Sequence, residues 1–347
     1  MVSTEDIGII LTLVAICVAI YIAYTQYQHL KKLEYMGNQT KGIAEKLTTS
    51  SVTHKCVNDF FVLKDKEKNK QKKYKCFFPV QYRSTPFPLI SEGDFYAIHL
   101  LTTYLGKDNL DLKGIVKDDS VADTSLEGNV IFICSPSANS ALKKIFDEKK
   151  IENEEDMKSV KDWLLTELKL PCWFVEDFRE SKNNDHPVRK IAIYNDSNNE
   201  IIEDLLASPT EPCYIVARKL KEGEKYNDNI NLQRDYGIFA RMNKNNNQYI
   251  IIVGIHGYGT WIVAELLNNL LSNKKVDYES VFRQSKDFIT IISGELNRKE
   301  LTVNWKSIMV HNQYMWVKEG DKWIRKYRDD LRTHMICEDE ERNMFNK

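Results

Sequence analysis

Two short polar loops carry the residues of this sequence that are best suited to chemistry. The first, at residues 254–260, reads GIHGYGT and contains Gly254, Gly257 and Gly259, followed by Thr260. Glycines let the backbone approach a ligand closely, and a helix that begins at Thr260 would offer unpaired N–H groups and a positive dipole end. We expect a cradle for a phosphate or oxyanion, and His256 could add a hydrogen bond. The alternatives are a tight turn capped by Thr260 and a structural histidine.

The second loop follows the apolar run NVIFIC and contains Ser135, Ser137 and Asn139. In open α/β sheets, ligands bind outside the carboxyl ends of the strands, where the strand order switches. We therefore expect the two loops to share one crevice, although Ser137 or Asn139 could instead be a plain helix cap. Neither loop matches a Walker or dinucleotide-binding motif.

Charged residues near these loops are weaker candidates. Arg234 and Arg241 could pair with phosphate, but arginines of this kind are usually on the surface. Glu176, Asp177 and Glu265 could act as acid or nucleophile in a glycosidase-like reaction, although such carboxylates are usually only solvated. No serine-hydrolase or zinc-protease motif occurs, so we assign no catalytic residue. The seven histidines lack metal-ligand spacing, so we expect no metal site and no cofactor.

Two strand–loop–helix units must position the loops, one starting at residue 130 and the other at residue 250. Their continuous apolar runs indicate strands buried on both faces. Shorter runs at 172–178, 190–194 and 213–220, with links rich in Asn, Asp and Pro, indicate antiparallel additions. The sequence predicts an α/β fold: a three-layer Rossmann-like mixed sheet with flanking helices and an embedded hairpin region.

Further elements follow from local signals. Ser91 as N-cap and Asp94 at the third helical position predict a helix that ends at Gly106. Helices are also expected at about 140–150 and 154–168. We expect strands at 237–242, 249–253 and 287–293, with the turn NKNNNQ joining the first two, and a terminal antiparallel pair at 301–303 and 313–317.

An uncharged segment at residues 7–24 is long enough to cross a bilayer. Glu5 and Asp6 precede it, and Lys31 and Lys32 follow it. The positive-inside rule then places the N-terminus outside and the remaining chain in the cytoplasm. A cleaved signal peptide would need a positive n-region and a small-residue cleavage site. We expect a single-pass protein of the inner (cell) membrane, with the lipid bilayer as one partner.

The composition divides the chain into four parts: an N-terminal transmembrane helix (1–28), a juxtamembrane helix and charged linker (29–75), a cytosolic ligand-sensing domain (76–320) and a charged tail (321–347). The lysine-rich run at 64–75 is either a lipid contact or a solvated loop. The net charge of -1 argues against general nucleic-acid binding. The seven cysteines form no C-x-x-C pair, which is typical of free thiols in a reducing compartment.

From NVIFICSPSAN through RDYGIFARM to IIIVGIHGYGT, the layout resembles the Rossmann-like sensor domains of bacterial antiviral defence, including the CARF and SAVED sensors. The resemblance covers about residues 76–317 and extends to the N-terminal membrane segment of membrane-anchored effectors. It is a likeness of layout without a shared motif. It implies a nucleotide or oligonucleotide second messenger, which a nucleotide-synthesising partner enzyme could supply. Ligand contacts would be carried over to the loops at 135–139 and 254–260.

Three functions fit these observations. The first is a membrane-anchored nucleotide sensor that forms a homo-oligomer, with a tetramer as the favoured guess, and whose transmembrane helices build a pore or ion channel. The second is a membrane-tethered hydrolase of nucleotides or NAD that uses Glu176, Asp177 or Glu265. The third is a scaffold that binds a protein and whose glycine loop is only a turn. We favour binding over catalysis because no catalytic set is evident.

Overall fold

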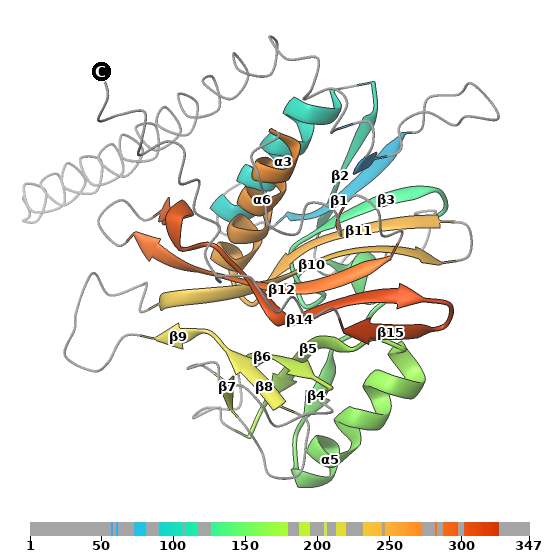
Figure 1. Ribbon diagram of the computed structural model, residues 1–347, viewed down its shortest axis with the longest axis vertical. Coiled ribbons are helices and arrows are strands. Elements are labelled where there is room, and N and C mark those ends of the chain that lie inside the picture. Colours follow the sequence, from blue (N-terminus) through green and yellow to red (C-terminus); the bar gives the residue numbers. More distant parts are fainter. Residues whose placement is uncertain are drawn as a thin grey trace, which may run out of the picture. The chain divides into compact units, whose positions relative to one another are not determined.

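Two β-sheets and a pair of packed helices form the described part of the chain (Figure 1). The computed structural model describes residues 57, 60–61, 73–80, 90–106, 108–116, 126–179, 187–194, 205–206, 213–219, 232–244, 247–272, 282, 287–297 and 302–325. All of them belong to one unit, residues 55–347. The predicted transmembrane helix lies outside the described residues. Within those residues, no helix combines the length and apolar character needed to cross a bilayer.

The larger sheet is mixed and follows the strand order β15-β14-β12-β10-β11-β3-β1-β2, while β13 pairs with β12 and β9 with β10. Its strands are β1 (Tyr74–Val80), β2 (Leu110–Val116), β3 (Asn129–Ile133), β9 (Arg218–Lys219), β10 (Leu232–Lys244), β11 (Asn247–Gly254), β12 (Phe288–Asn297), β13 (Thr302–Val303), β14 (Met309–Glu319) and β15 (Lys322–Arg325). β11, β3, β1 and β2 are parallel, and the remaining pairs are antiparallel. The predicted hairpin at NKNNNQ is confirmed as β10–β11.

Helices α3 (Glu92–Leu105) and α6 (Gly257–Leu271) pack against each other over one face of this sheet. The sequence predicted the ends of α3 correctly. The Ser91 hydroxyl accepts a hydrogen bond from the Asp94 N–H, and Gly106 closes the helix with φ of 72°. Helix α3 connects the parallel strands β1 and β2, a crossover that the sequence analysis did not predict.

A smaller sheet covers the opposite face of the larger one. Its order is β4-β5-β6-β8-β7, and its strands are β4 (Lys149–Ile151), β5 (Cys172–Asp177), β6 (Val188–Ile193), β7 (Leu205–Leu206) and β8 (Cys213–Val216). Phe132 and Tyr249 of the larger sheet share a buried cluster with Trp173 and Phe174 of β5. The short helix α4 (Ser140–Lys143), helix α5 (Glu154–Asp162) and the π-helix η1 (Trp163–Leu168) belong to this layer.

The chain therefore has an α/β fold with mixed sheets and helices. Several predicted elements were wrong in detail. The helix expected at 140–150 ends after Lys143, and residues 149–151 form β4. The segments 301–303 and 313–317 do not pair with each other, because strands β13 and β14 both pair with β12.

The domain also extends past its predicted limits at both ends. Val57, Phe60 and Phe61, which precede the expected boundary at residue 76, are buried against it. At the other end, Lys322–Arg325 forms β15 although the charged tail was expected to begin at residue 321.

Candidate functional site

The two predicted loops follow adjacent parallel strands, β3 and β11. The chain after β11 enters α6 on one face of the sheet. The chain after β3 enters α4, whose Ala141 and Leu142 belong to the buried cluster on the other face. This divergence of neighbouring connections is the switch point at which α/β sheets bind ligands. The loops at 135–139 and 254–260 thus lie at the same edge of the sheet, and the shared crevice that the sequence predicts stays a prediction.

In the loop after β3, Asn139 has a structural role. Its amide nitrogen donates to the Phe77 and Ile133 carbonyls at 3.0 and 2.9 Å, and its oxygen accepts the N–H groups of Ala141 and Leu142. These four bonds use the full capacity of the side chain, so Asn139 caps α4 and ties β1 to β3. Ser135 and Ser137 differ, since their hydroxyls bond to each other at 2.9 Å and retain further capacity.

The glycines of the second loop permit close backbone packing. A Cβ atom at Gly254 would overlap the backbone of Thr260, and one at Gly259 would overlap the Tyr236 carbonyl. Neither glycine has a positive φ. Gly257 is less confined, because its nearest neighbour would be the Ser91 hydroxyl at 3.2 Å. The glycines thus hold α6 tightly against β10 and α3, which accounts for them without a ligand.

At the amino end of α6, a backbone N–H group is already bonded to a carboxylate, Asp235, to which the sequence analysis gave no role. Asp235, fully buried on β10, accepts the Gly259 N–H at 2.6 Å. Its other oxygen lies 3.3 Å from Nδ1 of His256. A negative charge at this point satisfies the helix dipole and disfavours a phosphate there. His256 is the half-exposed member of an Asp–His pair beside the loop.

Thr260 lies deeper and meets a second buried carboxylate, Asp94 on the first turn of α3. Within the described residues, Oγ1 of Thr260 and Oδ1 of Asp94 form no hydrogen bond of full geometry, although Thr260 lies close enough to Asp94 to favour its charged form. Burial raises the pKa of Asp94 to about 6, although the side chains of Ser91, Cys134 and Thr260 oppose the rise. Buried polar groups without partners are uncommon and need an explanation, such as a ligand.

Cys134 connects these groups to the loop after β3. It has φ of 74°, a region that a non-glycine residue enters only at a cost and that is enriched at functional sites. Burial, reinforced by the Asp94 charge, keeps the pKa of its thiol well above the usual range. The thiol is therefore neutral and not an activated nucleophile. We call Asp94, Cys134, Ser135, Ser137 and Thr260 the switch-point cluster.

A second group of side chains from the smaller sheet reaches the same loop. Glu148 accepts the backbone N–H of Ser137, and its pKa rises to about 8 because it is buried and faces the charge of Glu176. Arg189 lies 3.7 Å from Glu176 and favours the charged form of Glu148. The Arg189 charge also acts on Cys134. We call Glu148, Glu176 and Arg189 the Arg189 cluster.

The remaining predicted site residues lie in other environments. Asp177 is buried and bonded to Arg179 and Lys190, and these bonds outweigh its burial and lower its pKa. Glu265 accepts the Tyr96 hydroxyl and the Asn268 amide across α3 and α6.

The two arginines occupy β10. Arg234 pairs with Glu295 on β12 at 3.1 Å. Side chains alternate along a strand, so it faces away from the layer that Asp235 points into. Arg241 is buried, where it bonds to the Phe60 and Phe282 carbonyls.

The sequence analysis named the two serines, Thr260 and Glu176 as candidates, but not the other members of the two clusters. Asp94 was identified only as part of a helix cap. Glu148 and Arg189 reach the loop through pairing of β4 and β6 with β5, which no local pattern reveals. The strained backbone of Cys134 also leaves no trace in the sequence.

Comparison of the chain with protein-family models, curated proteins and solved structures finds no match.

Proposed function

We propose that this chain is a membrane-anchored effector whose cytosolic, Rossmann-like domain binds a nucleotide-type signal. Binding would control an oligomeric assembly of the N-terminal transmembrane helices, a pore or channel, in bacterial antiviral defence. The observation that carries the proposal is the pair of buried polar groups at the switch point. Asp94 and Thr260 are buried next to each other and each has a polar atom without a hydrogen bond of full geometry in the described residues, at the place where an α/β sheet receives ligands.

The chemistry of the site suits the sugar end of a nucleotide better than its phosphates. A carboxylate such as Asp94 accepts hydrogen bonds from ribose hydroxyls, and the hydroxyls of Ser135, Ser137 and Thr260 both donate and accept. Asp235 already occupies the N–H group of Gly259 at the amino end of α6. Arg189, held 3.7 Å from Glu176, is the nearby cation that remains for a phosphate.

The Arg189 cluster supports a second candidate, a membrane-tethered hydrolase of nucleotides or NAD. Glu148 and Glu176 are neighbouring carboxylates, and the pKa of Glu148 is raised to about 8. One protonated and one ionised carboxyl is the arrangement that glycoside hydrolysis uses. Of the earlier candidates, only Glu176 belongs to this pair, because Asp177 and Glu265 are engaged elsewhere. Glu148 would be the acid.

Native mass spectrometry of the full-length chain in mild detergent tests the proposal, because it reports bound small molecules and subunit number together. We expect an oligomer that carries a nucleotide. Thr260→Val removes the hydroxyl while conserving shape and should reduce occupancy about ten-fold. Thr290→Val is the matched control, since Thr290 is also buried with an unbonded hydroxyl in the described structure but lies on β12.

Other outcomes separate the alternatives. A monomer without bound small molecules would contradict the sensor and favour a protein-binding scaffold. Steady conversion of added NAD or nucleotide that is lost in Glu148→Gln and Glu176→Gln, but kept in Glu265→Gln, would establish the hydrolase instead.

A further inference from the structure

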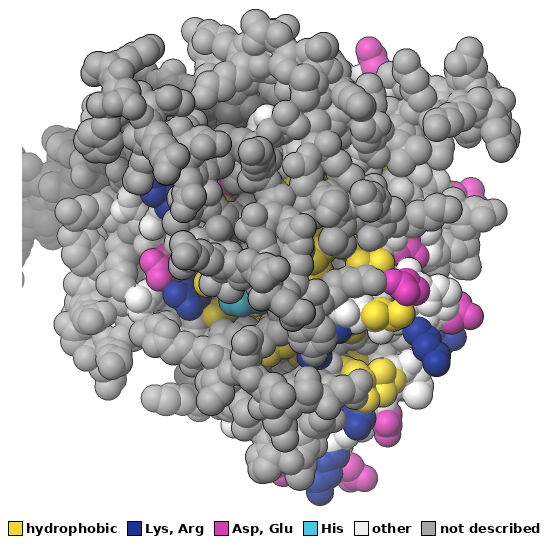
Figure 2. Space-filling model, in the orientation of Figure 1, with side chains coloured by type: hydrophobic (Ala, Val, Ile, Leu, Met, Phe, Trp, Pro, Cys, Tyr) yellow, Lys and Arg dark blue, Asp and Glu magenta, His cyan; other side chains and the backbone are white. Residues whose placement is uncertain are grey.

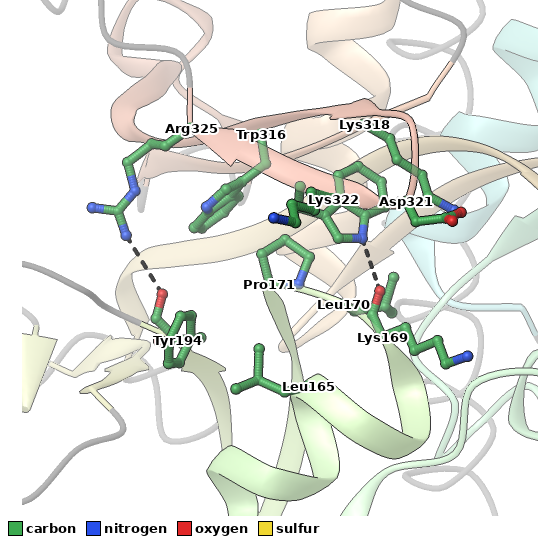
Figure 3. Close-up of a pocket in the computed structure, with 11 residues that line it drawn as sticks. Leu165, Lys169, Leu170, Pro171, Tyr194, Trp316, Lys318, Asp321, Lys322 and Arg325 are labelled. Carbon is green, nitrogen blue, oxygen red and sulfur yellow. Dashed lines mark hydrogen bonds between the residues drawn. The ribbon is translucent and has the colours of Figure 1, made fainter.

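A cavity of about 820 Å³ is lined by residues from 165–171, 194 and 316–325, none of which belongs to the switch-point cluster. One wall is the connection between η1 and β5, and the other is the β14–β15 hairpin (Figure 3). Its volume falls within the range of small-molecule sites. Sequence analysis gave no function to either wall and assigned residues 321–347 to a charged tail.

Three aromatic side chains line this cavity, of which Trp316 is buried and Trp323 is partly exposed. Trp316 and Trp323 come from the hairpin, and Tyr194 lies opposite them. The Trp323 indole N–H donates to the Lys169 carbonyl at 2.8 Å, which fixes the plane of this ring. The guanidinium of Arg325 lies 5.6 Å from the Trp316 ring centre and bonds to the Tyr194 carbonyl. The indoles are therefore held in place before any ligand arrives.

The charge around the cavity is strongly positive. Lys169, Lys318, Lys322 and Arg325 line it, against the single carboxylate of Asp321. Within the described residues, no carboxylate forms an ion pair with any of these three lysines. Figure 2 shows hydrophobic, basic and acidic side chains next to one another on the face over β15 and α5. A cavity lined by both lysines and aromatic side chains suits an anion that carries a flat ring.

The backbone beside the cavity is unusual in two ways. Helix α5 continues as the π-helix η1, and Lys169 immediately after it has φ of 56°. π-helical turns occur often at functional sites, and a non-glycine residue in the left-handed region is strained. This geometry turns the Lys169 carbonyl toward Trp323. Both features therefore help to fix the position of the Trp323 indole.

We propose that this cavity is a second ligand site, for a small anion bearing an aromatic ring, of the nucleoside phosphate class. The ring stacks on Trp323 beside Trp316, and the phosphate contacts Lys318, Lys322 and Lys169. The site shares no residue with the switch-point cluster, so its test does not depend on the function proposed above.

Titration of the full-length chain in detergent tests this site, with adenosine monophosphate as probe. Quenching of tryptophan fluorescence and calorimetry both measure binding. We expect adenosine or inorganic phosphate alone to bind at least about ten-fold more weakly, since stacking and charge both contribute. The variant with Lys318→Glu and Lys322→Glu, both at solvent-accessible positions, should weaken the monophosphate about ten-fold and leave adenosine unchanged. Trp323→Ala should weaken both, while Trp323→Phe retains stacking and guards against a folding defect.

Trp305→Ala and Lys306→Glu are matched controls, because they alter a lysine–tryptophan pair 5.4 Å apart on the 3-10 helix η2 (Trp305–Ser307), outside the cavity. They should bind like the unaltered chain. Absence of binding, or binding that the cavity variants leave unchanged, would overturn the site. Loss of binding in Thr260→Val but not in the cavity variants would place the monophosphate at the switch-point cluster instead.

Discussion

At the scale of single residues, Asp94 determines much of the chemistry at the switch point. Its backbone N–H completes the cap of α3, while its carboxyl is buried beside Thr260 and Cys134. A buried carboxyl with an unbonded oxygen costs stability when it ionises. The protein keeps it nonetheless, which is expected of a group that serves binding.

Asp94→Asn should change how stability depends on pH. Burial raises the pKa of Asp94 to about 6 in the folded state, above the ordinary value of 3.8 for an aspartate. Its contribution to stability is therefore fully present below pH 3.8 and is lost as the pH rises through 6. The loss amounts to as much as about 3 kcal/mol, at 1.36 kcal/mol per pKa unit. Urea unfolding at pH 4 and pH 8 should show this decrease in the native chain and not in Asp94→Asn.

Asp111→Asn, which alters an exposed carboxyl on β2, is the control and should follow the native chain. If the free energy of unfolding changed equally with pH in the native chain and in Asp94→Asn, Asp94 would not be buried as described.

Individual site residues were predictable only where they carry a local signal. Ser91 and Asp94 stood out as a capping pair, and Ser135, Ser137 and Thr260 stood out because small polar residues followed apolar runs. Asp235, Glu148 and Arg189 carry no such signal. Asp235 meets its loop across the β10–β11 hairpin, and Glu148 and Arg189 meet theirs through the pairing of β4 and β6 with β5. The same limit hid the role of Asn139, whose partner Phe77 is 62 positions away.

At the scale of elements, the crossing of α3 and α6 sets the position of the site. Gly93 on α3 approaches the Gly257 carbonyl so closely that a Cβ atom would overlap it. The side of α3 next to the crossing also carries Asp94. The sequence predicted both helices, but it gave no sign that their backbones touch. The strand β2 was missed altogether, since its Leu112 is exposed and its pattern is short.

Gly93→Ala should separate the helices and displace Asp94. Overpacking against backbone costs about 1–3 kcal/mol, because the carbonyl cannot move aside as a side chain can. Gly257→Ala is the matched comparison on the facing helix. Its Cβ would meet only the Ser91 hydroxyl at 3.2 Å, so we expect a change below about 1 kcal/mol. Thermal unfolding of both variants measures the difference, and equal destabilisation would refute the close crossing.

At the scale of the whole molecule, the proposed function requires that a signal from the switch-point cluster reach residues that precede the sheet. Val57, Phe60 and Phe61 are the described residues of the segment that precedes the sheet. Phe60 stacks on Phe239 of β10 at 5.9 Å, and Phe61 packs edge-on against Tyr74 of β1 at 5.4 Å. Arg241 of β10 also holds this segment, because its guanidinium donates to the Phe60 carbonyl at 3.0 Å. Burial lowers the pKa of Arg241 to about 10. The segment is thus fixed to the same strand, β10, that holds Asp235.

Arg241→Met should loosen this attachment. It removes the bonds to the Phe60 and Phe282 carbonyls, at about 1–3 kcal/mol for each buried group left unbonded. Hydrogen exchange followed by mass spectrometry should then show faster exchange around residues 57–61, with α6 and β11 still protected. Arg234→Met, on the same strand but paired with Glu295, is the matched control and should leave exchange near residues 57–61 unchanged.

Because the switch-point cluster is untouched, Arg241→Met should still bind ligand while the membrane response fails. Unchanged hydrogen exchange around residues 57–61 in Arg241→Met would exclude Arg241 as the link between the ligand site and the membrane segment. An unimpaired membrane response despite faster exchange there would exclude it as well.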